Sequence, residues 1–527
     1  MARNKSRSEY TATQGSVYLI TSDGRTLDLP IPSRSPSDPL NWSWFKKALS
    51  ILAVSLFSII GLVQVQGTAL VLGMLENEYT PESMKPLHLE VLAFIPCIAW
   101  GVGALIWVPL STVLGRRPVF LFCTILLTFS TILAAISQNF YTHLFARCLQ
   151  GIAGSISPSI ILLMIIDVLY IHQRPMYIAL FWCLCNSFSN VGLAATPYIV
   201  EYGGSWRSFY WIWSAPSALT IFLALFWAPE SSFSRPPMAF DGRILSQAEN
   251  GKVTVYSKWE EVPGGKPMLE DPPIWKATSF IKNIIFWNRT KTGGWKDVRA
   301  SFRQILICAL NPLIIWVWVL NALVFGGMVV TCQTYVKLLM APPYNFTFKE
   351  IGLAKFSPAI GALLAFPASG ILTTQVIRFL ATRNRGVREP EHYLPSFILP
   401  VITATVSLAL YGVAAEGHWN WRWITLFVGI DYFSAISLFV SNVLWVTEAF
   451  PRWAGPAVVI VGANGYALSF TFSSAIVPWI QAQGFGKTYV ELAVMTLAIG
   501  LIGFPVNYWG KRFREYIYAR WSDDSEE

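Results

Sequence analysis

Apolar residues occur along the chain in long blocks, and short polar segments separate these blocks. A helix needs about 20 apolar residues to cross a hydrocarbon core about 30 Å thick. We expect membrane-spanning helices at 49–72, 89–112, 118–138, 143–166, 175–198, 206–227, 305–333, 351–373, 395–413, 422–446, 455–479 and 488–508. The pattern therefore predicts an all-α membrane protein with 12 transmembrane helices.

The polar stretches predict where the chain leaves the membrane. No apolar block occurs before Leu49, which is too late for a cleaved signal peptide. Within the central loop, apolar residues at helical spacing among cations in 274–291 predict either a basic helix on the inner leaflet or an ordinary linker helix. We expect a cytosolic disordered tail at 1–48, a six-helix bundle at 49–227, a cytosolic central loop at 228–304, a second six-helix bundle at 305–510 and a cytosolic tail at 511–527.

The positive charges predict the orientation. Lys and Arg concentrate in the segments on one side of the predicted helices, including both tails and the central loop. Cytosolic loops carry the excess of Lys and Arg in membrane proteins, so both termini are expected in the cytosol. We expect a multi-pass protein of the plasma membrane, with the vacuolar membrane as an alternative. On the outer side, the sequon at Asn345 predicts N-glycosylation.

Composition narrows the class of protein. The chain has 527 residues, of which 54% are hydrophobic and only 13% charged. Soluble domains have about 25% charged residues, which argues against a soluble enzyme. The net charge of +9 is explained by membrane loops rather than by nucleic-acid binding. The 7 cysteines form no CxxC pair, and the 5 histidines lie in loops or at helix ends without a catalytic cluster, so we expect no enzyme, metal site or cofactor.

Four short motifs identify a family resemblance. They are PLSTVLGRRPVFL (109–121), FARCLQGIAGSISPS (145–159), GLAATPYI (192–199) and WRSFYWIWSAP (206–216). Together they resemble the major facilitator superfamily, in particular a fungal branch of its twelve-span drug:proton antiporters. The resemblance implies two pseudo-symmetric six-helix bundles around a central cavity, related by an axis along the membrane normal.

The first motif predicts a gating loop. Gly115, Arg116 and Arg117 form a tight turn with two cations that can bind helix carbonyls and acidic groups. Asp167, at the end of the fourth predicted span, is the expected partner. The resemblance implies a latch that stabilises the outward-facing state, and topology charges without a latch are the alternative.

Part of that latch is missing from the sequence. Thr112 occupies the position of the family's loop aspartate, and Thr374 is its neutral counterpart in the second half. Glu448 occupies in the second half the place that Asp167 has in the first. We expect Glu448 to be a gate or structural charge that pairs with Arg378 or Arg452.

Charges inside the predicted spans are few. Arg147 lies in the second motif, and the resemblance implies a part in proton coupling and in the electrostatics of the substrate site. Lys355 and Asp431 lie in the eighth and tenth spans, which are neighbours in the superfamily fold. We expect either a Lys355–Asp431 pair or Asp431 alone to carry protons; a structural pair is the alternative.

The resemblance also implies which spans line the cavity. Its polar and aromatic candidates are Gln64, Gln66, Asn186, Asn190, Asn321, Gln333, Tyr335, Asn464 and Tyr466. Any of them can instead bridge helices, as intramembrane Asn and Gln often do.

The expected function is secondary active transport by a monomer. We expect proton-coupled efflux of a small organic compound by alternating access. Proton-coupled uptake of an organic cation such as a polyamine is one alternative, and a membrane sensor that has lost transport is another.

Overall fold

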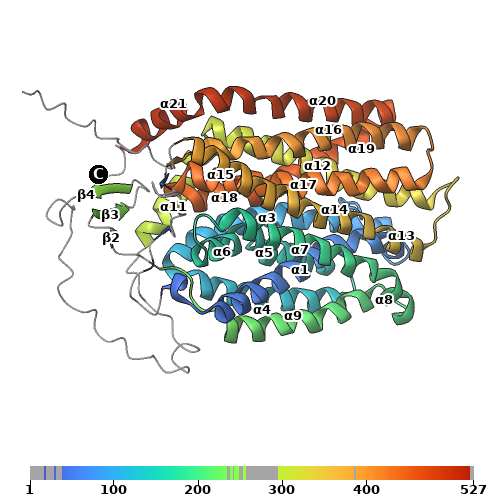
Figure 1. Ribbon diagram of the computed structural model, residues 1–527. Coiled ribbons are helices and arrows are strands. Elements are labelled where there is room, and N and C mark those ends of the chain that lie inside the picture. The colour runs from blue at the N-terminus through green and yellow to red at the C-terminus, as the bar shows by residue number, and fades with distance from the viewer. Residues whose placement is uncertain are drawn as a thin grey trace, which may run out of the picture.

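The computed structural model describes residues 17–18, 29–30, 32, 38–233, 238–240, 243–247, 253–256, 295–384 and 387–522. In these ranges, 12 helical spans are long and apolar enough to cross a membrane, which confirms the predicted fold class. The spans run side by side in two groups, with the first half of the chain below and the second half above in Figure 1. The basic helix expected at 274–291 lies outside the described residues.

The spans of the first half begin close to their predicted positions. Proline at the first turn suits a helix because its missing N–H would have no partner there, and Pro175 and Pro197 occupy such positions. The helices are α1 Trp44–Leu75, α2 Pro81–Met84, α3 Val91–Leu114, α4 Arg116–Ile136, α5 Phe140–Gly154, the π-helical η2 Ser157–Ile161, α6 Leu162–Val168, α7 Arg174–Ala194, α8 Thr196–Gly203 and α9 Arg207–Trp227, preceded by the short η1 Pro39–Asn41.

The second half repeats this arrangement. Its spans eight and eleven contain π-helical segments near Pro367 and Pro456, as span four does near Pro158. The helices are α11 Trp295–Ala309, α12 Pro312–Met340, α13 Phe348–Ala354, α14 Phe356–Phe366, η4 Pro367–Leu372, α15 Thr373–Arg383, η5 Pro390–Phe397, α16 Ile398–Glu416, α17 Trp421–Ala449, η6 Pro451–Trp453, α18 Ala454–Val458, η7 Val459–Ala463, α19 Asn464–Gln483, α20 Phe485–Leu501 and α21 Gly503–Ser522.

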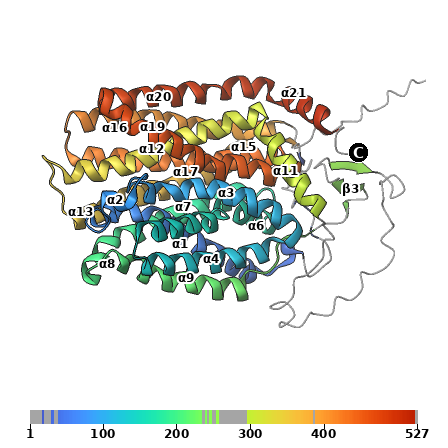
Figure 2. The same cartoon turned by 180° about the vertical axis from the view of Figure 1, so that it is seen from behind.

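Two boundaries differ from the prediction. The seventh span begins at Pro312, because Asn311 caps the new helix by accepting a hydrogen bond from the amide of Leu313 at 3.0 Å. The preceding α11 is a separate helix that packs against α3 and α18, which belong to different halves (Figure 2). At the C-terminus the helix continues to Ser522 rather than ending near 510.

Five short strands were not predicted. β2 Met238–Phe240, β3 Arg243–Gln247 and β4 Val253–Tyr256 form an antiparallel sheet in the central segment. In the sequence, an Asp-Gly pair stands between β2 and β3. Such a pair is typical of a two-residue hairpin turn, and it is the sequence feature from which this hairpin could have been predicted. β1 Val17–Tyr18 pairs antiparallel with β5 Val387–Arg388.

The outer surface of the helices is apolar. On α4 the exposed residues Phe122, Ile125, Phe129, Ile132 and Ile136 recur every three or four positions. This spacing places them on one helix face. A face of this kind is stable against lipid but not against water, which agrees with a transmembrane position.

The two ends of the bundle are distinct. We call the end where α1 begins and α21 ends the tail end, and the opposite end the far end. The central strands and α11 lie at the tail end (Figures 1 and 2). Asn345 is exposed in the loop between α12 and α13, at the far end, with a positive φ of 52°.

Candidate functional site: a cavity between the two halves

A cavity of about 510 Å³ lies between the two halves. Residues of α1 and α3 form one wall, and residues of α12, α17 and α19 form the other. The volume falls in the range typical of sites for small organic molecules.

The cavity opens toward the far end. Glu76, which follows α1, and Glu90, which precedes α3, are exposed members of its lining. Lys337 is exposed in the last turn of α12, at the same end. These three charged residues form the mouth of the cavity.

The tail end is closed by direct contact between the halves. A Cβ atom added at Gly462 of η7 would lie 2.7 Å from the carbonyl oxygen of Pro158 in η2, so only glycine permits this approach. Nearer the tail end, Arg174 of the first half donates to the Glu448 carboxylate of the second half at 3.0 Å. The structure is therefore open at the far end and shut at the tail end.

Glu448 has partners that the sequence did not predict. Its second carboxylate oxygen accepts a hydrogen bond from Arg388, which also bonds the hydroxyl of Tyr393 at 2.9 Å. The expected pairing with Arg378 is therefore wrong, and the side chain of Arg452, the other expected partner, lies outside the described part of the chain. Arg174 begins α7 and Arg388 lies in β5, so both partners come from other elements, and spacing along α17 could not identify them.

Four of the predicted cavity residues line the cavity. Gln66, Asn186, Gln333 and Tyr466 are part of its wall. The hydroxyl of Tyr432 donates to the amide oxygen of Gln66 at 3.3 Å, which joins the two halves across the cavity. Tyr432 was not among the predicted residues.

The other five predicted cavity residues lie outside the lining. Gln64 is two positions from Gln66, on the opposite face of α1, so both cannot face one cavity. Its amide donates to Ser217 at 2.8 Å and accepts from Thr131 at 2.7 Å. The remaining four, which bond within their own half or pack behind the wall, are Asn190, Asn321, Tyr335 and Asn464.

Lys355 lines the cavity, but it does not pair with Asp431. Its ammonium lies 5.2 Å from the ring centroid of Tyr335, a cation–π contact. Although α14 packs against α17 as predicted, no ion pair joins the two charges within the described chain. The predicted Lys355–Asp431 pair is therefore wrong.

Asp431 is buried one layer behind the cavity wall, with 2% of its surface exposed. Neither carboxylate oxygen has a hydrogen bond of normal geometry within the described residues. The hydroxyl of Thr331 on α12 faces it and also lacks such a bond. A buried carboxylate with only one facing hydroxyl is costly when charged, and a proton removes that cost.

Arg147 is fully buried and holds three helices together. It donates to the carbonyls of Leu92 at 2.9 Å, Gln64 at 2.6 Å and Val65 at 2.7 Å, and to the Gln150 side chain at 2.6 Å. It does not line the cavity. Its hydrogen bonds go to neutral groups, so the geometry favours a structural part over direct contact with a substrate.

The loop at Gly115–Arg117 binds two acidic groups, of which the sequence predicted one. Arg116 forms an ion pair with Asp167, the predicted partner. Gly115 has a φ of 93°, which glycine adopts without strain. The following amides of Arg116 and Arg117 each donate at 3.1 Å to the carboxylate of Glu230, a second acid that the sequence analysis missed.

Both threonines at the latch positions are bonded to their own helices. Thr112 donates to the carbonyl of Pro109, and Thr374 to that of Gly370, each at 2.7 Å. A threonine bonded in this way leaves no charge to hold the neighbouring span. At the tail end Glu448 joins the two halves through Arg174, whereas Asp167 and Glu230 bind residues of the first half.

A histidine network at the far end was not found by sequence reasoning. His143 is completely buried, although its position suggested a helix end. Its ring stacks on Trp206 with a centroid distance of 4.9 Å, and its Nε2 lies 3.0 Å from the hydroxyl of Tyr210. The Tyr79 hydroxyl lies 3.4 Å from Nδ1. Its partners come from distant parts of the chain.

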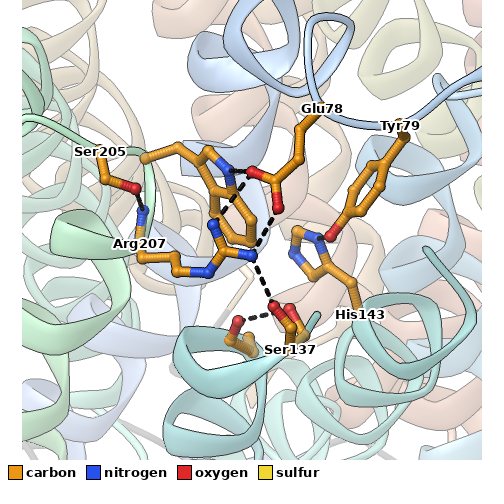
Figure 3. Close-up of polar contacts among 8 residues, drawn as sticks. Glu78, Tyr79, Ser137, His143, Ser205 and Arg207 are labelled. Carbon is orange, nitrogen blue, oxygen red and sulfur yellow. Dashed lines mark hydrogen bonds and ion pairs between the residues drawn. The ribbon is translucent and has the colours of Figure 1, made fainter. Parts of the chain in front are cut away.

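Glu78 joins this network to the surface. Arg207 donates to it at 2.6 and 3.0 Å, and the indole N–H of Trp206 donates at 2.6 Å (Figure 3). The hydrogen bonds from Arg207 hold the pKa of Glu78 below its ordinary value. Among the described residues, no cluster of His, Cys, Asp and Glu could hold a metal ion.

Comparisons with known proteins agree with this architecture. A family model described as Major Facilitator Superfamily matches residues 49–469. An uncharacterised MFS-type transporter of Schizosaccharomyces pombe is 23% identical, over 96% of this chain and 91% of the relative. Protein HOL1 of Saccharomyces cerevisiae is 22% identical, over 95% and 92%. Multidrug transporter FLR2 of Candida glabrata is 24% identical, over 93% and 78%.

Solved structures share the fold at low identity. The human organic anion transporter MFSD10 superposes with a TM-score of 0.56 at 12% identity, over 87% of this chain and 99% of that one. The proton:xylose symporter XylE superposes with a TM-score of 0.57 at 14% identity, over 90% and 100%.

Proposed function

The chain belongs to the Major Facilitator Superfamily, a family of transporters, and we propose that it exports a small organic compound in exchange for protons. The observation that carries the proposal is the cavity between the halves, open at the far end and shut at the tail end. Alternating access needs such a site and two gates that open in turn. The name of the Candida glabrata relative, a multidrug transporter, supports export of drug-like compounds.

The proposed orientation places the tail end in the cytosol and the far end outside the cell. The excess of Lys and Arg in the tails and central segment supports it. With this orientation Asn345 is an exposed extracellular sequon in a monomer of the plasma membrane. Glycosidase treatment of the full-length protein tests this orientation. The native chain should lose mass, whereas Asn345→Gln should not. No loss of mass in the native chain would contradict the orientation.

Asp431 is the proposed proton carrier. It is buried, without a hydrogen bond of normal geometry among the described residues, and close to the cavity wall. Protonation and deprotonation at this position can alternate with substrate binding, because the buried charged form needs more stabilisation than the one facing hydroxyl of Thr331 supplies. Arg147 is proposed to support coupling by keeping α1, α3 and α5 together.

Transport by vesicles tests the proposed function. A panel of compounds is first screened for resistance in cells that overexpress or lack the protein, and a compound that responds is then followed in inside-out vesicles. An acidic interior should drive accumulation of the compound, and collapse of the pH gradient should abolish it. Accumulation that does not depend on the pH gradient would contradict proton coupling. An absence of transport for every compound would instead favour the sensor alternative.

A further inference from the structure

The charged residues of the cavity are distributed unevenly. Glu76, Glu90 and Lys337 are exposed at the mouth, where water screens them. Lys355 is the one charged residue of the lining that is buried, with 5% of its surface exposed. It lies seven residues beyond Phe348 along the eighth span, which corresponds to about 10 Å of helix.

The ammonium of Lys355 has no acidic partner in the described chain. Its contact with the ring of Tyr335 orients the group but leaves its charge in place. Asp431, the acid on the adjoining helix, makes no ion pair with it and does not line the cavity. A lysine carries three donors and no acceptor, so the group is complementary to an anion.

Several aromatic side chains line the same cavity as Lys355. Tyr466 makes an edge-to-face contact with Trp100 at a centroid distance of 4.5 Å and with Phe325 at 4.1 Å. Phe94 also lines the cavity. Ring faces and edges of this kind accommodate a flat apolar body, while the neutral amides of Gln66 and Gln333 provide hydrogen bonds.

We propose that the cavity binds organic anions, in which a carboxylate contacts Lys355 and an apolar or aromatic skeleton lies against Trp100, Phe325 and Tyr466. This inference rests on the proposed function, because it names the substrate class of the same cavity. It also disfavours an organic cation as substrate: inside the mouth a cation meets a positive charge and no carboxylate of the lining.

Binding of three matched probes to the purified full-length protein tests the inference. 2-Naphthoate, 2-naphthamide and 2-naphthylmethylammonium share one skeleton and differ in charge, and their affinities are measured by titration calorimetry. The carboxylate should bind about tenfold more tightly than either other probe. Lys355→Gln should reduce its affinity to that of the amide, while Lys355→Arg should retain the preference.

Lys487→Gln is the matched control, because it removes an exposed cation on α20 that does not line the cavity. It should leave all three affinities unchanged. Tightest binding of the ammonium probe, equal binding of the three probes, a carboxylate preference that survives in Lys355→Gln, or no measurable carboxylate binding would each overturn the inference.

Flux measurements in proteoliposomes distinguish a failure of this inference from a failure of the proposed function. Lys355-dependent binding of naphthoate without movement of any anion across proteoliposomes would contradict transport and leave the anion site standing. Proton-driven flux of a compound without dependence on its negative charge would support transport and overturn the anion site.

Discussion

At the scale of single residues, the buried charges fall into two kinds. Arg147 donates hydrogen bonds to neutral oxygen atoms at 2.6–2.9 Å and holds neighbouring helices together. Asp431 has no hydrogen bond of normal geometry in the described part of the chain, and Lys355 faces the cavity without an acid. A satisfied charge stabilises one conformation, whereas an unsatisfied one gains from a proton or ligand. The mechanism is therefore expected to depend on the second kind.

Asp431→Asn tests the proposed proton carrier. The amide is close in shape but does not titrate, so accumulation driven by a pH gradient should fall at least ~10-fold. Exchange of substrate across the membrane without a gradient should remain within about twofold, because it needs no net proton movement. Vesicle flux measures both, with Asp431→Glu as the control that retains a carboxyl. Full gradient-driven transport by Asp431→Asn would refute the assignment.

The Glu78 ion pair predicts a dependence of stability on pH. Because the pKa of Glu78 is lowered in the folded protein, its contribution is present above the ordinary glutamate pKa and is lost as the pH falls through the lowered value. The pair is partly exposed, so about 1 kcal/mol is at stake. Thermal unfolding measured between neutral and acidic pH should show a steeper loss for the native chain than for Glu78→Gln. Parallel curves would count against this contribution.

At the scale of elements, the sequence was informative about helices and their depth. The apolar blocks located the 12 spans, and the resemblance implied that spans eight and ten are neighbours. It was less informative about which way a side chain turns. Gln64 and Gln66 lie at nearly the same depth in the membrane but on opposite faces of α1. Lys355 lies beside α17 but does not contact Asp431. The direction of a side chain depends on packing between distant segments, which one sequence does not reveal.

The closest approach of η2 and η7 predicts a steric switch. Gly462→Ala should destabilise the tail-closed state by about 1–3 kcal/mol, because the new methyl group meets the carbonyl of Pro158. Gly455→Ala, in the neighbouring α18, is the matched control, since its added Cβ would have its nearest neighbours at 3.6–3.7 Å. Spin labels on exposed tail-end residues of the two halves should show longer separations in Gly462→Ala alone. Equal separations in both variants would exclude the switch.

At the scale of the whole molecule, the two halves remain in contact at the tail end although both latch positions are threonines, because the Arg174–Glu448 pair and the approach of Gly462 to Pro158 cross between them. Glu448 bridges Arg174 and Arg388, and Glu230 holds the turn at Gly115. The sequence predicted a gate or structural charge at Glu448 but not its partners, because these lie at the start of α7 and in β5, 274 and 60 residues away. The Arg174–Glu448 pair crosses between the halves, so the proposed opening of the tail end requires this pair to break.

Glu448→Gln should weaken tail-end closure. The variant keeps the side chain's size but loses the charge that Arg174 and Arg388 share, so the protein should spend more time open at the tail end. Glu491→Gln, in the first half of α20, is the control for loss of one acid outside the gate. Distances between spin labels on the two halves at the tail end can be measured in the purified protein. Glu448→Gln should show a second population with a longer distance. An unchanged distribution would remove Glu448 from the gate.

Labelling of Cys97 tests most directly whether the cavity opens at the far end and is gated at the tail end. Cys97 lines the cavity, and a variant that retains it as the single cysteine is exposed in intact cells to a membrane-impermeant thiosulfonate. We expect rapid labelling of Cys97 from outside the cell. Adding Glu448→Gln should slow this labelling, because the change favours the tail-open state. Labelling only from the cytosolic side, or a rate that Glu448→Gln increases, would contradict the proposed gating.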